Sequence, residues 1–302
     1  MITRDVGEFL DIARAVPVDR PACAKALFLV APEGFALAHE SARDNRYMDL
    51  AQTVNVERAL AQHRGLQRAL SAGRPTICFA GDPATPDAVF PNNAFATAPG
   101  RVMLGHMRHP LRQRETERTD ICRFFTDTLG YALHDLRAQP GICELTGSLV
   151  IDRARGLGFC GLSERCDETG AAAMHAAFDL RATLLFDLAP GEYHCNVVMS
   201  ALAGRALALC PDGFADSALP AALAALYALA VVELDSREKA AFAGNCITLT
   251  DDTVWMSEAA ADALTARSRR SFERAGLALH AIALDEIEKA GGSLRCCIGE
   301  IY

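Results

Sequence analysis

The chain has 302 residues, of which 51% are hydrophobic and 23% charged. This composition is typical of a folded globular protein with a large buried core, and it excludes disordered and collagen-like chains. The net charge of −8, with only three lysines, argues against a nucleic-acid ligand.

In chain order, the first strong pattern is a helical periodicity over residues 55–72 that ends at Gly73, followed by a β-prone apolar stretch at 75–80. The same order of helix and strand recurs four times, at 114–129 and 131–136, 168–178 and 183–188, 220–227 and 229–234, and 258–275 and 277–284. Five modules that recur about every fifty residues predict a repeat architecture rather than two unrelated domains.

Each module leaves room for a β-hairpin after its strand. The predicted hairpin segments are 88–107, 143–162, 194–210, 242–256 and 293–302. No helix follows the last segment, so its natural partner is a strand predicted near the N-terminus, at 24–30. We therefore expect one α/β domain over residues 1–302, with the N- and C-terminal strands closing a ring.

Cysteine usage and hydropathy bear on the compartment. Eleven cysteines, an odd number without paired spacing, are typical of reduced thiols in a cytoplasmic protein. Residues 1–10 carry charges where a signal peptide needs an apolar core. The longest apolar run, 218–232, is shorter than the roughly 20 residues that a membrane span needs, so no membrane partner is expected.

Polar or reactive residues occupy equivalent places in the five hairpins. They are Asn93, Glu144, His194, Asn245 and Cys296, with separations of 51, 50, 51 and 51 residues. In a closed ring such positions converge on the axis. A thiol, an imidazole and a carboxylate that meet there suit nucleophilic catalysis with a general acid and base.

Other reactive residues have simpler interpretations. Most cysteines are small buried hydrophobes, but Cys296 follows Gly291 and Gly292, which allow a close approach of the backbone to a ligand. We place Cys296 on a strand, with its neighbour Cys297 facing the opposite side. The charged run at 114–118 is interpreted as a solvated helix face, and His175 as a packing residue. CxxC, HExxH and phosphate-binding glycine motifs are absent, so we expect no metal and no organic cofactor.

Six separated motifs then occur in one order, between residues 29 and 302. They are FxxxxExAxxN at 35–45, FPNN, TGSLV, YHxNVVM, AGN and GGSxRC. Together with Ser163-Glu164-Arg165, they resemble the pentein superfamily, and within it the citrulline-utilisation hydrolases. The superfamily includes arginine deiminases, dimethylarginine hydrolases and amidinotransferases. The resemblance implies a five-bladed α/β propeller.

The resemblance also implies a role for individual residues. Cys296 is the expected nucleophile, His194 the general acid and base, and Glu144 the carboxylate that orients the imidazole or binds a substrate nitrogen. Arg165 and Arg295 are expected to pair with a substrate carboxylate. The last set, Asn45, Asn93 and Asn196, is expected to line the end of the cavity that holds the reacting group.

Departures from the deiminase pattern guide the choice of substrate. Deiminases hold a guanidinium with aspartates, and the matching positions here are Asn93 and Asn196. Amides suit a neutral ureido group, which favours hydrolysis of citrulline to ornithine, carbon dioxide and ammonia. Arginine dihydrolase or deiminase and dimethylarginine hydrolase are the alternatives, followed by an amidinotransferase and a non-catalytic ligand-binding homologue. The partner is in each case a small amino-acid molecule, and whether the protein forms a homodimer stays open.

Overall fold

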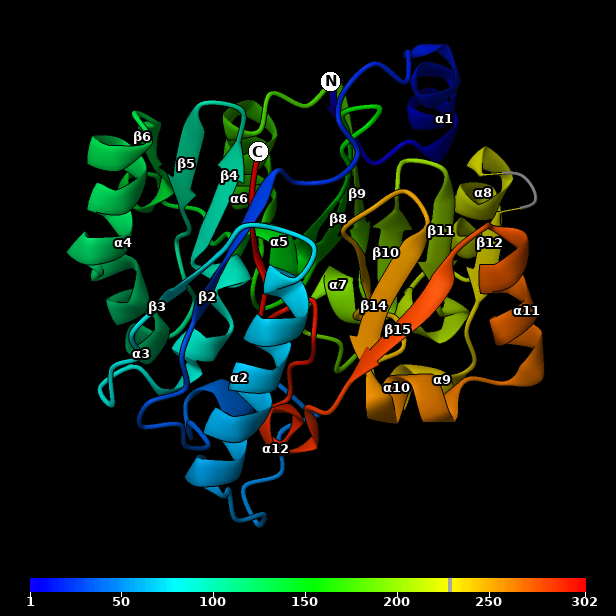
Figure 1. The fold of residues 1–302 in the computed structure, drawn as a ribbon. Helices are drawn as coiled ribbons and strands as arrows, with labels where there is room; N and C mark the ends of the chain where they lie inside the picture. Colours follow the sequence, from blue (N-terminus) through cyan, green and yellow to red (C-terminus); the bar gives the residue numbers. More distant parts are fainter. Residues whose placement is uncertain (228–229) are drawn as a thin grey trace.

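The protein is described here by a computed structural model, which covers residues 1–227 and 230–302. Its strands form five separate mixed sheets, each with three strands of the repeat (Figure 1). Four of these sheets have the same design, in which an antiparallel hairpin is joined by a third strand parallel to its second strand. The third strand follows a helical segment, so the predicted module is confirmed.

The strands of the four like sheets lie inside or next to the predicted segments. The first two sheets contain β4 (Phe95–Ala98), β5 (Arg101–Leu104) and β6 (Ala132–Asp135), and β7 (Leu149–Asp152), β8 (Leu157–Leu162) and β9 (Ala182–Asp187). The next two contain β10 (Met199–Leu202), β11 (Ala206–Leu209) and β12 (Val231–Glu233), and β13 (Ile247–Thr248), β14 (Thr253–Ser257) and β15 (Ala278–Ile282). Leu229, the predicted start of the β12 strand, lies outside the described residues.

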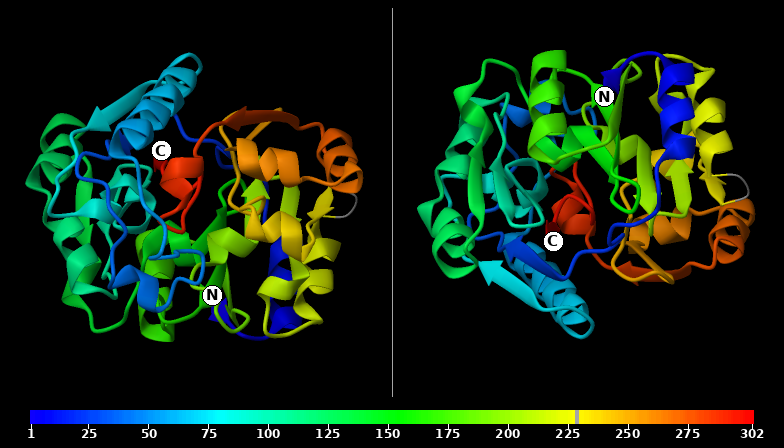
Figure 2. Two further views of the ribbon diagram at one scale, coloured as in Figure 1. Left: turned by 90° about the horizontal axis from the view of Figure 1, so that it is seen from below. Right: turned by 90° about the horizontal axis from the view of Figure 1, so that it is seen from above.

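The fifth sheet joins segments from both ends of the chain. β2 (Ala26–Val30) pairs in parallel with β3 (Thr76–Phe79) and antiparallel with β16 (Gly299–Ile301). Gly299 stands opposite Phe28, where a Cβ atom would collide with the phenylalanine ring. The pairing of the terminal segments is therefore as expected, and it carries the turn that contains Cys296 to the middle of the molecule. Figure 2 shows the five sheets and their helices around this segment.

Three of the predicted helices are continuous and two are broken. The continuous ones are α2 (Val56–Ser71), α6 (Glu168–Ala177) and α8 (Leu219–Leu226). The helix expected at 258–275 consists of α10 (Glu258–Ala263) and α11 (Ala266–Arg274). Leu264 leaves the helical conformation, and the Thr265 side chain accepts a hydrogen bond from the Ser268 N–H, which begins α11.

The segment expected as a helix at 114–129 is also divided. It contains a 3₁₀ turn at 114–117, α4 (Thr119–Arg123) and a π turn at 124–128. Arg118 between them is extended and donates to the carbonyl of Ala80 at 2.9 Å. The interpretation of this run as a solvated face is wrong for Glu115, which is buried and paired with Arg112 at 2.8 Å.

The N-terminal elements were not predicted. β1 (Ile2–Thr3) adds a fourth strand to the sheet of β9, and α1 (Val6–Ala15) packs Phe9, Leu10 and Ala13 into the core. The remaining helices are single turns or little longer: α3 (Pro110–Gln113), α5 (Leu145–Ser148), α7 (Cys195–Val198), α9 (Ser236–Ala240) and α12 (Asp285–Glu288). Among the described helices, none is long and apolar enough to span a membrane.

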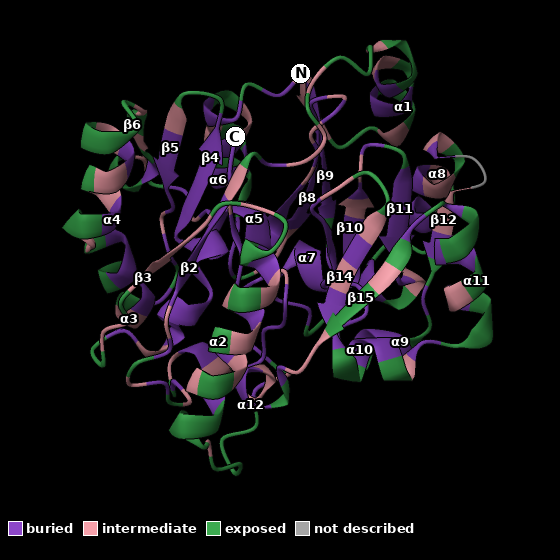
Figure 3. Cartoon of the chain, viewed as in Figure 1, coloured by how far each residue is buried: buried purple, intermediate pink, exposed green. Residues whose placement is uncertain are grey.

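The hairpin strands of the sheets are mostly buried, whereas β6, β15 and the outer faces of the helices are exposed (Figure 3). Apolar side chains fill the space between each sheet and its outer helix, as where Phe28 of β2 packs edge to face on Phe125 with ring centroids 5.3 Å apart. The inner ends of the sheets are different, because buried polar side chains gather there. These polar side chains form the candidate site.

Candidate active site

The five equivalent polar positions come together at one end of the hairpins. Asn93, Glu144, His194 and Asn245 each lie just before the first strand of a like sheet, and Cys296 lies before β16. All five are buried. Glu144 and His194 lie at the N-terminal ends of the short helices α5 and α7, rather than at strand starts. These tight turns aim the side chains inward from different sheets.

Cys296 lies in a turn, which corrects its predicted place on a strand. Its N–H donates to the Ser293 carbonyl at 3.0 Å, and its Sγ is 3.3 Å from the Asn245 amide nitrogen. Gly291 upstream has φ +73°, and a Cβ there would lie 2.7 Å from Asn45 Oδ1. The glycine is therefore required for the turn to pass so close to Asn45. Cys296 lines a small cavity of about 10 Å³, and Cys297 does not.

His194 is held by one ring nitrogen and is free at the other. Its Nε2 lies 2.9 Å from Glu144 Oε2, while Nδ1 is buried without a partner. A carboxylate accepts only, so Nε2 carries the proton and Nδ1 presents a lone pair. Gly147 makes room for this ring, because a Cβ there would lie 2.8 Å from Nδ1 and would collide with Asn93 Oδ1. The geometry leaves the imidazole ready to accept a proton at Nδ1.

Glu144 is a fully buried carboxylate that stays ionised. Burial alone would raise its pKa, but the charge of Arg165 and the hydrogen bond from His194 outweigh that cost and lower the pKa far below its ordinary value. Arg165 Nη1 lies 3.1 Å from Oε2, and the Arg108 N–H donates to Oε1 at 3.1 Å. The carboxylate can therefore stabilise a protonated His194.

Arg165 has no N–H left for another partner. It donates from Nε and Nη2 to Asp44 at 2.8 and 2.6 Å, from Nη2 to the Ser41 carbonyl, and from Nη1 to both oxygens of Glu144. It lines the Cys296 cavity, but a substrate carboxylate would have to replace one of these partners. Holding Glu144 and the 41–44 segment is the role that its contacts support.

Arg295 lies apart from the Cys296 cavity. Its guanidinium pairs with Glu300 at 2.8 Å and donates to the Ile298 carbonyl at 3.0 Å. It lines a different cavity of about 40 Å³, together with Thr146 and Asn196. Its contacts therefore give no support to the expected pairing with a substrate carboxylate.

The three asparagines lie around Cys296 and its turn. Asn45 donates to the Gly291 carbonyl at 3.2 Å and lines the Cys296 cavity with Asn93. The Asn93 side-chain oxygen is buried without a partner. Asn196 donates to the Thr146 carbonyl at 3.1 Å, and its amide nitrogen lies 3.7 Å from Cys296 Sγ. The structure thus brings all three to the predicted region.

Two further residues of the cavity were not predicted from the sequence. Asp87 is buried, accepts a hydrogen bond from Ser41 at Oδ2, and has no partner at Oδ1. Burial raises its pKa, although Arg112 counteracts this effect. Arg112 is buried between Glu115 and Glu144, and it also lines the cavity. The only signal for Asp87 in the sequence is its position three residues before the FPNN motif.

Protonation of the two reactive groups follows from their burial. Burial raises the pKa of the Cys296 thiol above its ordinary value of 9.0, and it lowers the pKa of His194 although Glu144 opposes that shift. At neutral pH these two groups are therefore a thiol and a neutral imidazole. Among the described residues, no group of three or more His, Cys, Asp or Glu side chains could hold a metal ion.

These pKa directions predict slow alkylation of Cys296 at neutral pH. Because only the thiolate reacts, the rate of labelling by iodoacetamide should rise with pH and still be rising above pH 9. Asn245→Ala removes a donor that favours the thiolate, so its labelling at a given pH should be slower still. Peptide mapping of residue 296 over a pH series measures both rates. Equal rates at pH 6 and pH 9 would contradict the raised pKa.

Fold and site together define a hydrolase of the pentein superfamily. The chain belongs to the family described as N,N dimethylarginine dimethylhydrolase, eukaryotic, whose model matches residues 31–302. It is 27% identical over 273 residues to the N(G),N(G)-dimethylarginine dimethylaminohydrolase of Mycobacterium tuberculosis (strain ATCC 25618 / H37Rv). The match covers 90% of this chain and 84% of that protein.

Solved structures share the fold. The N-terminal domain of ArgZ, described as an arginine dihydrolase from cyanobacteria and solved with bound substrate, superposes with a TM-score of 0.79 at 19% identity. That match covers 91% of this chain and 97% of the ArgZ domain. A dimethylarginine dimethylaminohydrolase bearing a 4-chloro-2-hydroxymethylpyridine adduct gives a TM-score of 0.71 at 19% identity, over 92% of this chain and all of the other.

Proposed function

We propose that this chain is a single-domain enzyme over residues 1–302, a closed five-bladed α/β propeller that hydrolyses the guanidino group of arginine or an N-methylated arginine. The observation that carries the proposal is a set of unpartnered acceptors, of which two line the cavity at Cys296 and the third, on His194, lies near Asn93 across Gly147. Asp87 Oδ1, Asn93 Oδ1 and His194 Nδ1 are buried without hydrogen-bond partners. A guanidinium offers only N–H donors and a positive charge, so it satisfies acceptors that are costly to leave unpaired.

Relatives support the same class of substrate. The proteins similar to this chain are described as acting on dimethylarginine or arginine. The preference for citrulline in the sequence analysis depended on a site without carboxylates, and Asp87 supplies one. Arginine-like cations are therefore the first candidates.

Hydrolysis of citrulline is the second candidate, because Asn93 and Asn196 stand near Cys296. Each amide can donate to a ureido oxygen and accept from its nitrogen. Incubation with arginine, monomethylarginine, dimethylarginine and citrulline, followed by mass analysis of the products, tests both candidates. The first requires a higher kcat/KM for a guanidino compound, and a higher value for citrulline would reverse the order.

The proposed mechanism uses the free atoms of the site. The Cys296 thiol first gives its proton to Nδ1 of His194. The resulting thiolate attacks the guanidino carbon, and a carbon–nitrogen bond breaks as the departing amine takes that proton from His194. A bound guanidinium next to the sulfur lowers the thiol pKa, which offsets the effect of burial. Water that loses its proton to His194 then attacks the same carbon, and the carbon–sulfur bond breaks to release a ureido product.

Substrate entry requires the segment between β2 and α2 to move. The cavity at Cys296 has a volume of about 10 Å³, enough for about one water molecule. Ser41, Asn45 and Met48 of this segment form part of its wall. Binding therefore includes an opening step, after which Asp44 and Arg165 would re-form their ion pair across the closed site.

His194→Ala is expected to lower turnover by roughly 10²- to 10⁴-fold, because one imidazole serves both proton transfers. Intact mass after acid quench should show an adduct on Cys296 in the wild type during turnover, and little in the variant. His175→Ala is the control, since His175 contacts Thr183 outside the site. A fully active His194→Ala enzyme would exclude the proposed proton transfers.

A further inference from the structure

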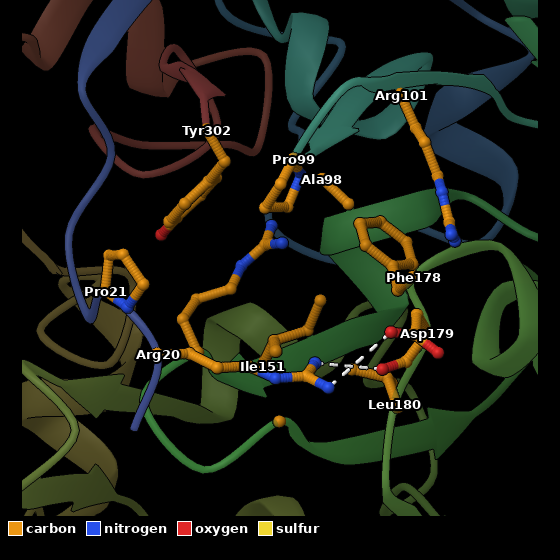
Figure 4. Close-up of a pocket in the computed structure, with 12 residues that line it drawn as sticks. Arg20, Pro21, Ala98, Pro99, Arg101, Ile151, Phe178, Asp179, Leu180 and Tyr302 are labelled. Carbon is orange, nitrogen blue, oxygen red and sulfur yellow. Dashed lines mark hydrogen bonds and ion pairs between the residues drawn. The ribbon is translucent and has the colours of Figure 1, made fainter. Parts of the chain in front are cut away.

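A cavity much larger than the one at Cys296 lies elsewhere in the molecule. It has a volume of about 260 Å³ and is formed by the β4–β5 turn, the β7–β8 turn, residues 178–180 and Tyr302 (Figure 4). The candidate active site lies at the N-terminal ends of β4 and β7, and this cavity lies at their C-terminal ends. The two sites are therefore separated by the length of a strand. Four residues at about 3.3 Å each make this about 13 Å. We call it the far cavity.

The far cavity is positively charged in a protein of net charge −8. Its wall contains Arg20, Arg101 and Arg153, and one acidic residue, Asp179, which lies 3.6 Å from Arg20. Arg101 donates to the Ala177 carbonyl at 3.3 Å, and Arg153 to the Thr97 carbonyl at 3.1 Å. Neither lies within 4 Å of any carboxylate that the structure describes. Two guanidinium groups therefore have charge and N–H donors to offer a ligand.

Flat apolar groups make up the rest of the wall. Arg153 lies over the Tyr302 ring at 4.2 Å and over the Phe178 ring at 5.2 Å. Figure 4 shows these rings on different sides of the cavity, with Pro21, Pro99 and Ile151 around it. The two rings contact the flat faces of the Arg153 guanidinium. The N–H groups at its edge can therefore donate to an anion.

We propose that the far cavity binds a small organic anion with a flat apolar part. Its carboxylate or phosphate group pairs with Arg101 and Arg153, and its flat part packs against Pro21, Pro99 and Ile151 of the wall. The volume is slightly below that of pockets for drug-sized ligands, which fits a single ring with one charged group. This site is separate from the proposed hydrolase site and does not depend on its activity.

Calorimetric titration of the wild-type protein with benzoate and with phenyl phosphate tests the proposal, and the two arms distinguish a carboxylate ligand from a phosphate ligand. At least one is expected to bind saturably. Benzamide has the same ring without the charge and is expected to bind at least about tenfold more weakly. This comparison needs no variant, so a folding defect cannot obscure it.

Arg101→Gln and Arg153→Gln locate the bound anion. Each is expected to weaken its binding about tenfold or more. Arg267→Gln on α11 is the matched control, because that arginine is exposed and distant from the far cavity, and melting curves verify the fold of all three. Absence of saturable binding, equal binding of benzamide, or unchanged binding in both variants would each overturn the proposal.

Discussion

Cys296→Ala is expected to lower kcat/KM by at least about a thousandfold, because it removes the sulfur that forms the covalent intermediate. Cys296 is the cysteine that lines the cavity with Asp87, Asn93 and Arg165. The neighbouring amide of Asn245 and the free Nδ1 of His194 stay in place in the variant. Steady-state release of ammonia or amine measures the loss.

Cys297→Ala is the matched control. Cys297 is fully buried in the apolar cluster beside β2 and does not line the cavity. Its replacement should cost about 1 kcal/mol of stability and leave most of the turnover. An active Cys296→Ala protein, or an inactive but folded Cys297→Ala protein, would refute the assignment of the nucleophile.

Asp87→Asn should lower kcat/KM for arginine by about 100-fold or more, because the variant takes a buried carboxylate away from a cation. Citrulline is neutral and should lose much less. Measuring both substrates with both proteins gives the change in selectivity. Asp82→Asn is the control. Asp82 lies at the surface in the same loop, and its Oδ1 accepts a hydrogen bond from the Ala84 N–H.

The opposite change is Asn93→Asp, which adds a carboxylate to the same cavity. It is expected to improve binding of arginine and to lower kcat/KM for citrulline. If Asp87→Asn left arginine hydrolysis unchanged, the carboxylate would have no part in substrate binding. Citrulline would then be favoured over arginine as the substrate.

Much of the fold was predictable because the repeat leaves local signals. Glycine stops such as Gly73 and Gly276 mark where helices end and strands follow. The 50- to 51-residue spacing identified positions that are in contact, since His194 bonds Glu144 and Asn245 lies beside Cys296. The pairing of segment 24–30 with segment 293–302 was predictable because no helix and strand follow the last hairpin segment, which leaves the N-terminal strand as its partner. Local patterns were sufficient for these features.

Features that depend on tertiary packing were missed. Asp87 resembles an ordinary turn residue, and only the contact with Ser41, 46 positions away, places it in the interior. Arg112 and Glu115 resemble a surface pair, because burial of an ion pair cannot be recognised from its spacing. Helix α1 has a local signal in the capping Asp5 and in the spacing of Phe9 and Ala13, but so short a pattern does not by itself distinguish a helix.

The pairing of β16 with β2 has a consequence for how activity appears during folding. Phe28 and Gly299 are partners across about 270 residues, so the contact closes one of the longest loops that the chain can form. Cys296 reaches the site only after β16 has paired with β2. The contact between His194 and Glu144, in contrast, requires the folding of only two adjacent modules. Catalytic competence should therefore be acquired late, after most secondary structure, and a partly folded intermediate would carry the acid–base pair without its nucleophile.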